Sequence, residues 1–221
     1  MSSDGVATRV RETVLASRDR FWRPEDFSDY SPGAVSHALG RLERSGELRR
    51  IHRGLYWRGT RTPLGMAPPP VDRLVKVLAP AKGSGPAGLS AALALGLSTQ
   101  VPRRTVIAVP ARAPAGTAAL RFVSRASSPG RRNLRAAEVA VLEVLRDWDA
   151  VVESPPAEAA SRIADLVGSG EIRADRVAKA SSGEPPAVRQ RLIGLLGDIG
   201  RPDLAAQVTP ARGRRPLALA G

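Results

Sequence analysis

The sequence predicts a mostly helical α+β protein with an N-terminal winged helix-turn-helix, a small α+β middle part and a helical C-terminal part. Apolar residues recur at intervals of three and four near the start of the chain and again after residue 135, as in amphipathic helices. Short apolar runs bounded by proline or glycine occupy the middle and favour strands there. A hydrophobic fraction of 43% over 221 residues is sufficient for one large domain or two small ones.

The first part is predicted to begin with a helix and a short extended segment. Val6, Val10 and Val14 recur at helical spacing, in a helix that ends near Ser17. Residues 21–22, a Phe-Trp pair, follow as an extended piece.

A capped helix comes next. Pro24 opens a short helix through Phe27, and Ser31 is placed to cap a third helix that has Pro32 at its first position and runs to about Ser45. Its apolar residues share one face, namely Val35, Ala38, Leu39 and Leu42. The opposite face is therefore available to a partner.

A basic hairpin is predicted to follow this helix. Gly46 suits the left-handed position beyond a helix end. Residues 47–59, ELRRIHRGLYWRG, alternate well enough to form two strands that turn at residues 52–54. Three helices followed by a hairpin is the order of elements in a winged helix-turn-helix.

We expect a winged domain at residues 1–62, a basic α+β region at 63–135 and a helical region at 136–221, with 63–221 forming one domain. RTPLGMAPPP, residues 61–70, is predicted to be a stiff, non-helical connector because it contains four prolines. Beyond it, helices are predicted at 71–79, 86–96, 136–148, 156–167, 172–180 and 186–199, and strands at 105–109 and 120–124.

The net charge of +13 favours a polyanionic partner, either nucleic acid or an anionic membrane. Residues 1–62 carry 12 basic and 8 acidic groups, and residues 63–135 carry 11 basic groups and 1 acidic group. Residues 136–221 carry 11 basic and 12 acidic groups, so the positive charge is concentrated in the first two parts. Nearly all basic residues are arginine, and alanine, glycine and proline are abundant, which high-GC coding also produces. The location of the arginines therefore carries more weight than their number.

Several functional classes are disfavoured. The absence of cysteine excludes disulfides, thiolate nucleophiles and zinc fingers. The N-terminus interleaves charges with apolar residues, and the longest small-apolar run, 88–97, is shorter than the roughly 20 residues of a membrane helix, so we expect a cytoplasmic protein. His37 and His52 have no nucleophile or carboxylate placed beside them, and the carboxylates of the tail are expected to be solvated. We expect no catalysis, metal or cofactor.

The third helix and the hairpin together predict a surface that binds DNA. A recognition helix needs a packed face, small residues near its start and polar or cationic side chains aimed outward. Residues short or flat enough for base edges are Ser31, Gly33, Ala34, Ser36 and His37. Arginines suited to phosphates or an adjacent minor groove are Arg41 and Arg44 on the helix and Arg49, Arg50 and Arg53 on the hairpin. The alternative to DNA binding is that these arginines form an ordinary solvated face. Trp22 and Trp57 are expected in the core and not at the binding surface.

Two segments resemble a known family. HRGLYWRG, residues 52–59, resembles the wing of AbiEi-type antitoxins, and GPAGLSAALALGLSTQVPRRTVIAVP, residues 85–110, resembles the middle region of that family. The resemblance covers residues 1–125. It implies a winged domain that binds inverted repeats in its own promoter, and a following domain that counters a nucleotidyltransferase toxin without a stable complex. The role of residues 97–102, LSTQVP, is either functional or that of a structural helix end.

The leading hypothesis is an antitoxin and transcriptional autorepressor that binds double-stranded DNA as a monomer or weak dimer. A stand-alone winged-helix regulator without a toxin partner is the alternative. A nuclease would need clustered carboxylates, and residues 63–135 contain only Asp72. Cations of the middle part without acidic neighbours in sequence could extend the DNA footprint or hold RNA or a nucleotide: Lys82, Arg103, Arg104, Arg112, Arg121, Arg125, Arg131, Arg132 and Arg135.

Overall fold

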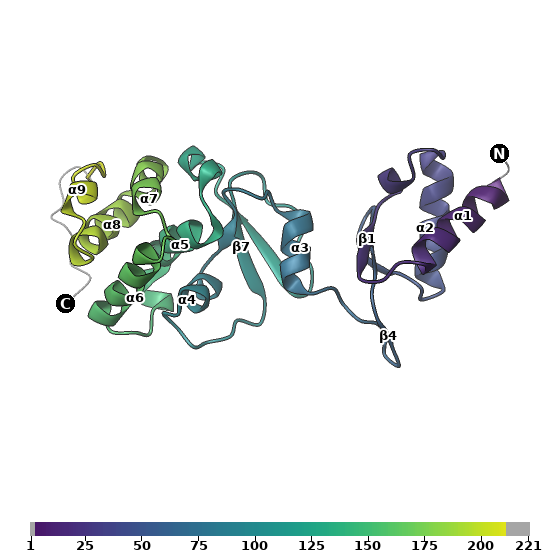
Figure 1. Ribbon diagram of the computed structural model, residues 1–221, viewed down its shortest axis with the longest axis horizontal. Helices are drawn as coiled ribbons and strands as arrows, with labels where there is room; N and C mark the ends of the chain where they lie inside the picture. The colour runs from purple at the N-terminus through teal and green to yellow at the C-terminus, as the bar shows by residue number, and fades with distance from the viewer. Residues whose placement is uncertain (1–2, 211–221) are drawn as a thin grey trace. The chain divides into compact units, whose positions relative to one another are not determined.

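The computed structural model describes residues 3–210, and the chain forms two compact units (Figure 1). The first unit extends to Leu74 and the second begins at Val75. Helices predominate and small sheets occur in both units, which confirms the predicted α+β fold class.

The first unit combines helices with a three-stranded antiparallel sheet. Its elements are α1 (Ser3–Leu15), β1 (Arg20–Trp22), the 3-10 helix η1 (Pro24–Phe27), α2 (Pro32–Arg44), β2 (Arg49–His52) and β3 (Leu55–Arg58). The strands pair in the order β1-β3-β2, with Phe21 opposite Trp57 and Arg50 opposite Tyr56. This succession of helices, strands and hairpin is that of a winged helix-turn-helix.

Helix α2 begins and ends where its flanking residues favour it. The Oγ of Ser31 accepts a hydrogen bond from the backbone N–H of Ala34 at 3.4 Å, and beyond the helix Gly46 takes a φ of +73°. The four predicted apolar residues are all buried, and Val35 and Leu39 are 0% exposed. The predicted packed face is therefore confirmed, and each such side chain stabilises the unit by about 1.5 to 3 kcal/mol.

The prediction of a stiff connector at residues 61–70 is wrong for its first half. There, β4 (Arg61–Thr62) pairs antiparallel with β5 (Gly65–Met66) in a second, shorter hairpin. Gly65 permits the turn because it takes a φ of +101°, a conformation that other residues rarely adopt. The indole N–H of Trp57 donates a hydrogen bond of 3.1 Å to the carbonyl of Ala67, the residue after β5, and so connects this hairpin to the three-stranded sheet.

The second unit contains a small mixed sheet. Its first elements are α3 (Val71–Leu78), in which the boundary between the units falls, β6 (Gly85–Pro86), α4 (Leu89–Leu95), β7 (Thr105–Val109) and β8 (Leu120–Ser124). β7 lies between β6, with which it is antiparallel, and β8, with which it is parallel. Both predicted strands are confirmed. The helix predicted at 86–96 begins later because the residues before it pair with β7 and Gly88 takes a φ of +55°.

The remainder of the second unit is helical. Its elements are the 3-10 helix η2 (Pro129–Asn133), α5 (Ala136–Val151), α6 (Pro156–Gly168), α7 (Ala174–Ala180), the 3-10 helix η3 (Ser181–Gly183), α8 (Pro186–Asp198) and α9 (Pro202–Ala205). Helix α5 is central, since it packs against α4, α7, α8 and β6, and Leu142 and Leu145 on it are 0% exposed. The four predicted tail helices are confirmed within a few residues.

A buried charge cluster contradicts the expectation that the carboxylates of the tail are solvated. Glu143 on α5 and Glu184 after η3 are 0% and 2% exposed, and Arg131 of η2 is 0% exposed between them. Arg131 Nε donates to Glu184 Oε1 at 2.5 Å, and its Nη1 donates to Glu143. Arg125 Nη2 contacts Glu143 Oε2 at 2.7 Å, and Arg146 Nη2 contacts Glu184 Oε2 at 2.7 Å. We name these five residues the arginine–glutamate cluster.

Charge pairing also sets the pKa values inside the cluster. Burial alone would raise the pKa of Glu184, but the hydrogen bond and the positive charge of Arg131 outweigh burial and lower it. Burial alone would lower the pKa of Arg131, and the two carboxylates raise it instead. Both residues therefore remain charged in the interior at neutral pH.

A third buried carboxylate, that of Glu138, is also held by hydrogen bonds. Glu138, at the start of α5, is 0% exposed and accepts hydrogen bonds from Arg173 Nε at 2.6 Å and from the backbone N–H of Arg135 at 2.7 Å. These bonds overcome the effect of burial and lower the pKa of Glu138. Arginines from residues 63–135 and from residues 136–221 thus form ion pairs and hydrogen bonds with buried carboxylates of the tail.

Candidate nucleic-acid interface

The outward face of α2 carries a stripe opposite its buried face, in which Gly40 is half-buried and the other three residues are exposed. Gly33, His37, Gly40 and Arg44 follow one another at intervals of four, three and four residues. No described atom lies within 4 Å of where a Cβ of Gly33 or Gly40 would be. Arg44 Nε donates to the carbonyl of Gly40 at 3.2 Å, so its stem lies along the helix. The stripe is flat, with a cation at its end, and suits close approach to base edges.

Not all of the short residues predicted at base edges are open to a partner. Ser31 uses its hydroxyl to cap α2, and Ala34 is partly buried against the core of the first unit. Gly33, Ser36 and His37 are exposed. The structure therefore brings three of the five to the surface without another role.

The two arginines of α2 lie on adjacent parts of the helix surface. Arg44 belongs to the outward stripe, whereas Arg41 lines a groove that α2 forms with α1. Arg41 is three residues before Arg44, and three rotations of about 100° leave the two side chains about 60° apart around the helix. Arg41 is therefore placed beside the outward stripe.

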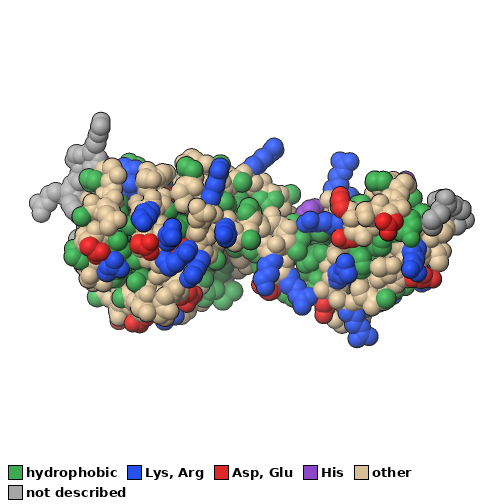
Figure 2. Space-filling model, turned by 45° about the horizontal axis from the view of Figure 1, so that its top comes forward, with side chains coloured by type: hydrophobic (Ala, Val, Ile, Leu, Met, Phe, Trp, Pro, Cys, Tyr) green, Lys and Arg blue, Asp and Glu red, His purple; other side chains and the backbone are tan. Residues whose placement is uncertain are grey.

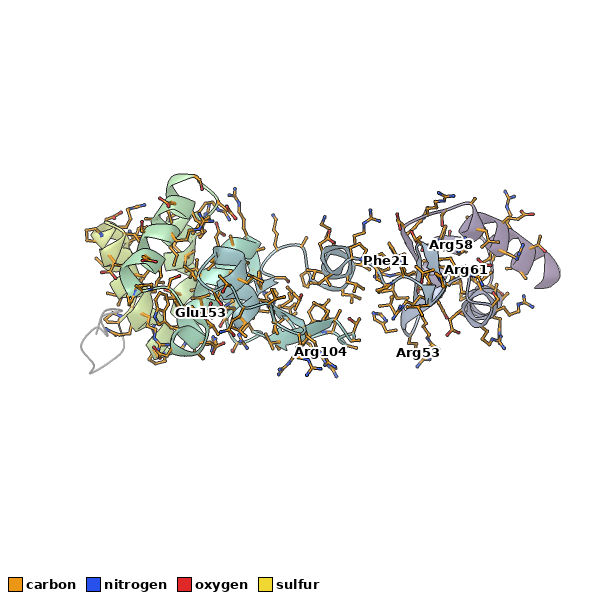
Figure 3. All side chains as sticks on the ribbon, turned by 90° about the horizontal axis from the view of Figure 1, so that it is seen from below. Phe21, Arg53, Arg58, Arg61, Arg104 and Glu153 are labelled. Carbon is orange, nitrogen blue, oxygen red and sulfur yellow. The ribbon has the colours of Figure 1, made fainter. Side chains whose placement is uncertain are left out.

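The three arginines predicted on the wing also differ in their surroundings. Arg49 Nη1 donates to the carbonyl of Met66 at 3.0 Å, so this side chain is engaged with the second hairpin. Arg50 is exposed on β2, and Arg53 is exposed at the turn, where Gly54 takes a φ of +74°. Figure 3 shows Arg53 pointing away from the first unit. Arg50 and Arg53 are the wing residues open to a backbone or a minor groove.

Sequence reasoning missed an ion-paired set beside the wing. Glu47 accepts from Arg58 Nη1 at 3.1 Å and from Arg61 Nη1 at 3.2 Å, which links the end of β3 to the second hairpin (Figure 3). The pairs join residues separated by a turn, and no helical or strand spacing relates them. These two arginines are partly neutralised and contribute less to an anion-binding surface than the number of arginines suggests.

The two tryptophans of the first unit lie inside it, as predicted. Trp22 is 2% exposed and Trp57 is 1% exposed, and Tyr56 is also buried. Trp22 stacks on Phe27 with ring centroids 5.2 Å apart. These rings stabilise the winged unit and present no stacking platform for bases.

The basic middle part is partly neutralised by carboxylates far away in sequence. Arg125 and Arg131 belong to the arginine–glutamate cluster, and Arg135 Nη1 donates to the carbonyl of Gly170 at 3.0 Å. The other middle cations are exposed: Lys82, Arg103, Arg104, Arg112, Arg121 and Arg132. Figure 2 shows basic side chains distributed over the visible face of the second unit. The positive field of this part is therefore weaker than its sequence indicates.

Residues 98–100, in the LSTQVP segment after α4, form hydrogen bonds with the carboxylate of Glu153, which is labelled in Figure 3. Glu153 accepts from the backbone N–H of Thr99 at 2.8 Å, from Gln100 Nε2 at 2.5 Å and from Ser98 Oγ at 2.8 Å. These bonds lower the pKa of Glu153, with the N–H of Thr99 as the largest cause. Of the two roles predicted for this motif, the structure displays a structural one, joining the end of α4 to the end of α5.

We expect acid to loosen this loop. The folded protein lowers the pKa of Glu153, so its hydrogen bonds contribute stability above the unfolded pKa of about 4.3 and lose it as the pH falls through the lowered value. The protection of the Thr99 amide against hydrogen exchange, relative to the intrinsic exchange rate at each pH, should then decrease, which NMR can follow as the pH is lowered below about 4. In Glu153→Gln this pH dependence should disappear. If the dependence persists in that variant, another group causes it.

Two further features bear on the kind of partner. Between residues 3 and 210, no helix has both the length and the apolar character needed to cross a bilayer. Within the same residues, His, Asp and Glu side chains do not gather in groups of three that could hold a metal ion.

Comparisons with known proteins place the chain beside uncharacterised relatives. Residues 12–117 match a family of unknown function, DUF6088. That match extends from α1 through the wing and β7, so it includes parts of both units. No curated protein matches the chain.

A solved structure shares the fold. The crystal structure of the RV2827C protein from Mycobacterium tuberculosis has 20% sequence identity and a TM-score of 0.52, covering 94% of this chain and 83% of that one. At this level of identity the similarity concerns the fold alone.

Proposed function

We propose that this protein is a winged helix-turn-helix transcription regulator that binds double-stranded DNA in its own promoter. The observation that carries the proposal is the outward stripe of α2, which has open space at the Cβ positions of Gly33 and Gly40 and ends at the exposed Arg44. Glycine within a helix costs about 0.5 to 1 kcal/mol relative to alanine, so two glycines on an uncovered face favour close approach by a partner. The exposed arginines of the wing supply contacts to the DNA backbone beside it.

The target is a pair of inverted repeats, read by two winged units. Two such units on one site arise either from a dimer or from two monomers that the DNA places side by side, and we propose a monomer or weak dimer. The protein has no catalytic step and is cytoplasmic. Its chemistry is binding.

The regulated operon is proposed to encode a toxin. The similarity of residues 52–59 and 85–110 to AbiEi-type antitoxins supports an antitoxin that counters a nucleotidyltransferase without a stable complex. The second candidate is a stand-alone regulator of the same fold. Co-expression with the product of an adjacent nucleotidyltransferase gene separates the two, because only an antitoxin restores growth.

The first test is a gel shift of the full chain with the DNA upstream of its gene and with a shuffled duplex, at two salt concentrations. We expect selective binding to the upstream DNA, and a loss of at least about tenfold in the double variant Arg41→Ala, Arg53→Ala, because each arginine contributes a charge-assisted hydrogen bond. The double variant Arg176→Ala, Lys179→Ala removes the same charge from exposed positions of the second unit and should bind like the wild type. Equal, weak and salt-labile binding to both duplexes would contradict the proposal.

A further inference from the structure

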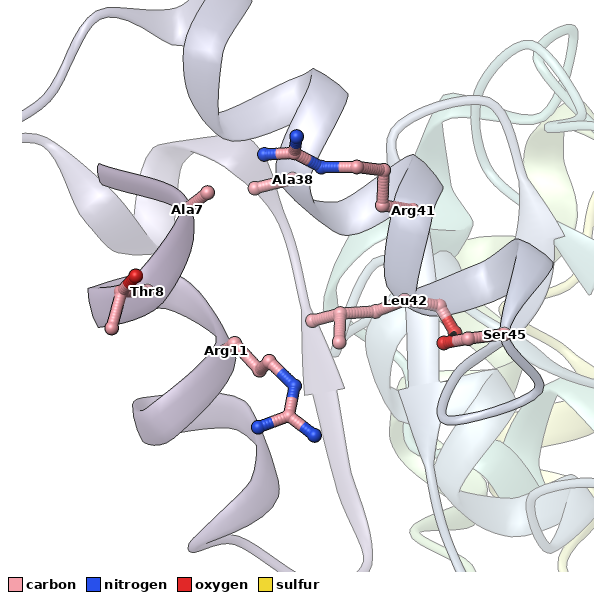
Figure 4. A pocket seen from close by; sticks show the side chains of 7 residues that line it. All are labelled: Ala7, Thr8, Arg11, Ala38, Arg41, Leu42 and Ser45. Atoms are coloured by element: carbon pink, nitrogen blue, oxygen red, sulfur yellow. Dashed lines mark hydrogen bonds between the residues drawn. The ribbon is translucent and has the colours of Figure 1, made fainter. Parts of the chain in front are cut away.

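A groove runs between α1 and α2, beside the outward stripe of the proposed recognition helix. It encloses about 400 Å³. Seven residues line it, namely Ala7, Thr8, Arg11, Ala38, Arg41, Leu42 and Ser45 (Figure 4). Arg41 belongs to the predicted DNA-binding residues, whereas Arg11 does not.

The two arginines approach the groove from different helices. Figure 4 shows the side chain of Arg11 on α1 and that of Arg41 on α2 on either side of the hollow, with no hydrogen bond between them. Both side chains are exposed. Among residues 3–210, neither guanidinium forms an ion pair with a carboxylate. Each therefore retains N–H donors for an external anion.

Acidic side chains near this groove are directed elsewhere. None of the lining residues is acidic. Glu12, which follows Arg11 on α1, lies 3.7 Å from Arg9 in a solvent-exposed pair. Glu43, on α2, lines a different hollow, together with Arg49 and Arg50. The groove thus has a local charge of one sign.

The walls of the groove strengthen its positive potential. Ala38 and Leu42 are 3% and 6% exposed, and together with Ala7 they form an apolar surface between the guanidinium groups. A cleft lined by one sign of charge with low-dielectric walls concentrates the electrostatic field and attracts counter-ions. Two guanidinium groups with open donors match the oxygens of a phosphate group.

We infer that this groove binds a backbone phosphate of the duplex, with Arg11 and Arg41 donating to it from opposite sides. The inference rests on the proposed function and extends it, because it assigns a DNA contact to α1. The contact positions α2 on the duplex and carries no base information. Arg11 is therefore a positioning residue.

The experiment measures the affinity of the full chain for the upstream duplex and for a shuffled duplex by fluorescence anisotropy over a range of salt concentrations. Arg11→Ala should weaken binding to both duplexes by about the same factor, roughly tenfold, and reduce the slope of log affinity against log salt by about 0.9. Arg9→Ala removes the same charge two residues away on α1 and should leave the slope unchanged. Arg11→Gln, which keeps a polar side chain of similar reach, should behave like Arg11→Ala, and circular dichroism checks that each variant is folded.

The outcomes separate this inference from the proposed function. Selective wild-type binding with an unchanged slope in Arg11→Ala would overturn the inference and leave the proposed function intact. Equal wild-type binding to both duplexes, with a slope reduced only in the Arg11 variants, would support the groove as a phosphate site and contradict the regulator. A wild type that binds neither duplex would contradict both. An acidic peptide that saturates the groove while selective duplex binding continues would overturn the inference alone.

Discussion

Replacing Arg131 by alanine is expected to lower the free energy of unfolding by about 3 to 5 kcal/mol, which is the usual cost of breaking a buried ion pair. The substitution removes the guanidinium that contacts both Glu143 and Glu184, and these carboxylates are 0% and 2% exposed. Arg125 still contacts Glu143, and Arg146 still contacts Glu184 and lies 3.9 Å from Glu143, but the two arginines are themselves partly exposed, at 21% and 24%. They cannot replace the central donor.

Urea unfolding of the full chain measures this loss, and hydrogen exchange of peptides from α5 locates it in the second unit. Arg132→Ala is the matched control, since Arg132 is the exposed neighbour and its loss should change stability by less than about 0.5 kcal/mol. A further variant, in which residues 131, 143 and 184 all become methionine, should recover most of the stability because no unpaired buried charge remains. If Arg131→Ala unfolds like Arg132→Ala, the cluster does not stabilise the unit.

Introducing glutamate at Gly40 is expected to strengthen the fold and abolish DNA binding. Gly40 lies inside α2 with open space at its Cβ position, so a helix-forming residue should raise the free energy of unfolding by about 0.5 to 1 kcal/mol. A carboxylate four residues before Arg44 adds a favourable pair on the helix surface. On the proposed DNA-facing stripe the same carboxylate opposes phosphates, and like charges cost several kcal/mol, a loss of about 100-fold or more in affinity.

Gly197→Glu is the control for this experiment. Gly197 lies in α8 of the second unit and also has open space around it, so the variant adds the same charge at a distance from α2. Gly40→Ala should share the gain in stability and lose less affinity than Gly40→Glu. Thermal unfolding measures the stability of the three variants, and duplex titration measures their affinity for DNA. We expect a gain in stability together with a loss of affinity only for the variants at residue 40. A folded Gly40→Glu protein that binds DNA normally would exclude the outward stripe as the contact surface.

The elements of the first unit could be predicted because local rules determine them. Ser31, Pro32 and Gly46 mark the ends of α2, and the spacing of Val35, Leu39 and Leu42 determines its buried face. The wing strands lie where they are predicted, but their burial does not alternate, since Leu55, Tyr56 and Trp57 are all buried. Each of these signals lies within a few residues of the structure that it predicts.

The features that sequence reasoning missed depend on contacts between distant residues. Glu143 lies in an apolar run of α5, yet its burial becomes intelligible only with Arg131, twelve residues earlier, and Arg125 beside it. Glu184 is 53 residues from the arginine that it accepts from. Arg11 looks like any exposed cation of an amphipathic helix until α2 is placed against α1. No local pattern distinguishes a solvated charge from one that finds a partner after folding.

The arginine–glutamate cluster also constrains how this chain can diverge. A change at residue 131, 143 or 184 alone leaves an uncompensated charge in the interior, so drift through single steps is blocked at each position. The three positions can change only as a set, to another paired arrangement or to apolar residues. Since they belong to η2, α5 and the segment after η3, we expect that a chimera in which only the middle or only the tail of the second unit is replaced leaves a buried charge without its partner.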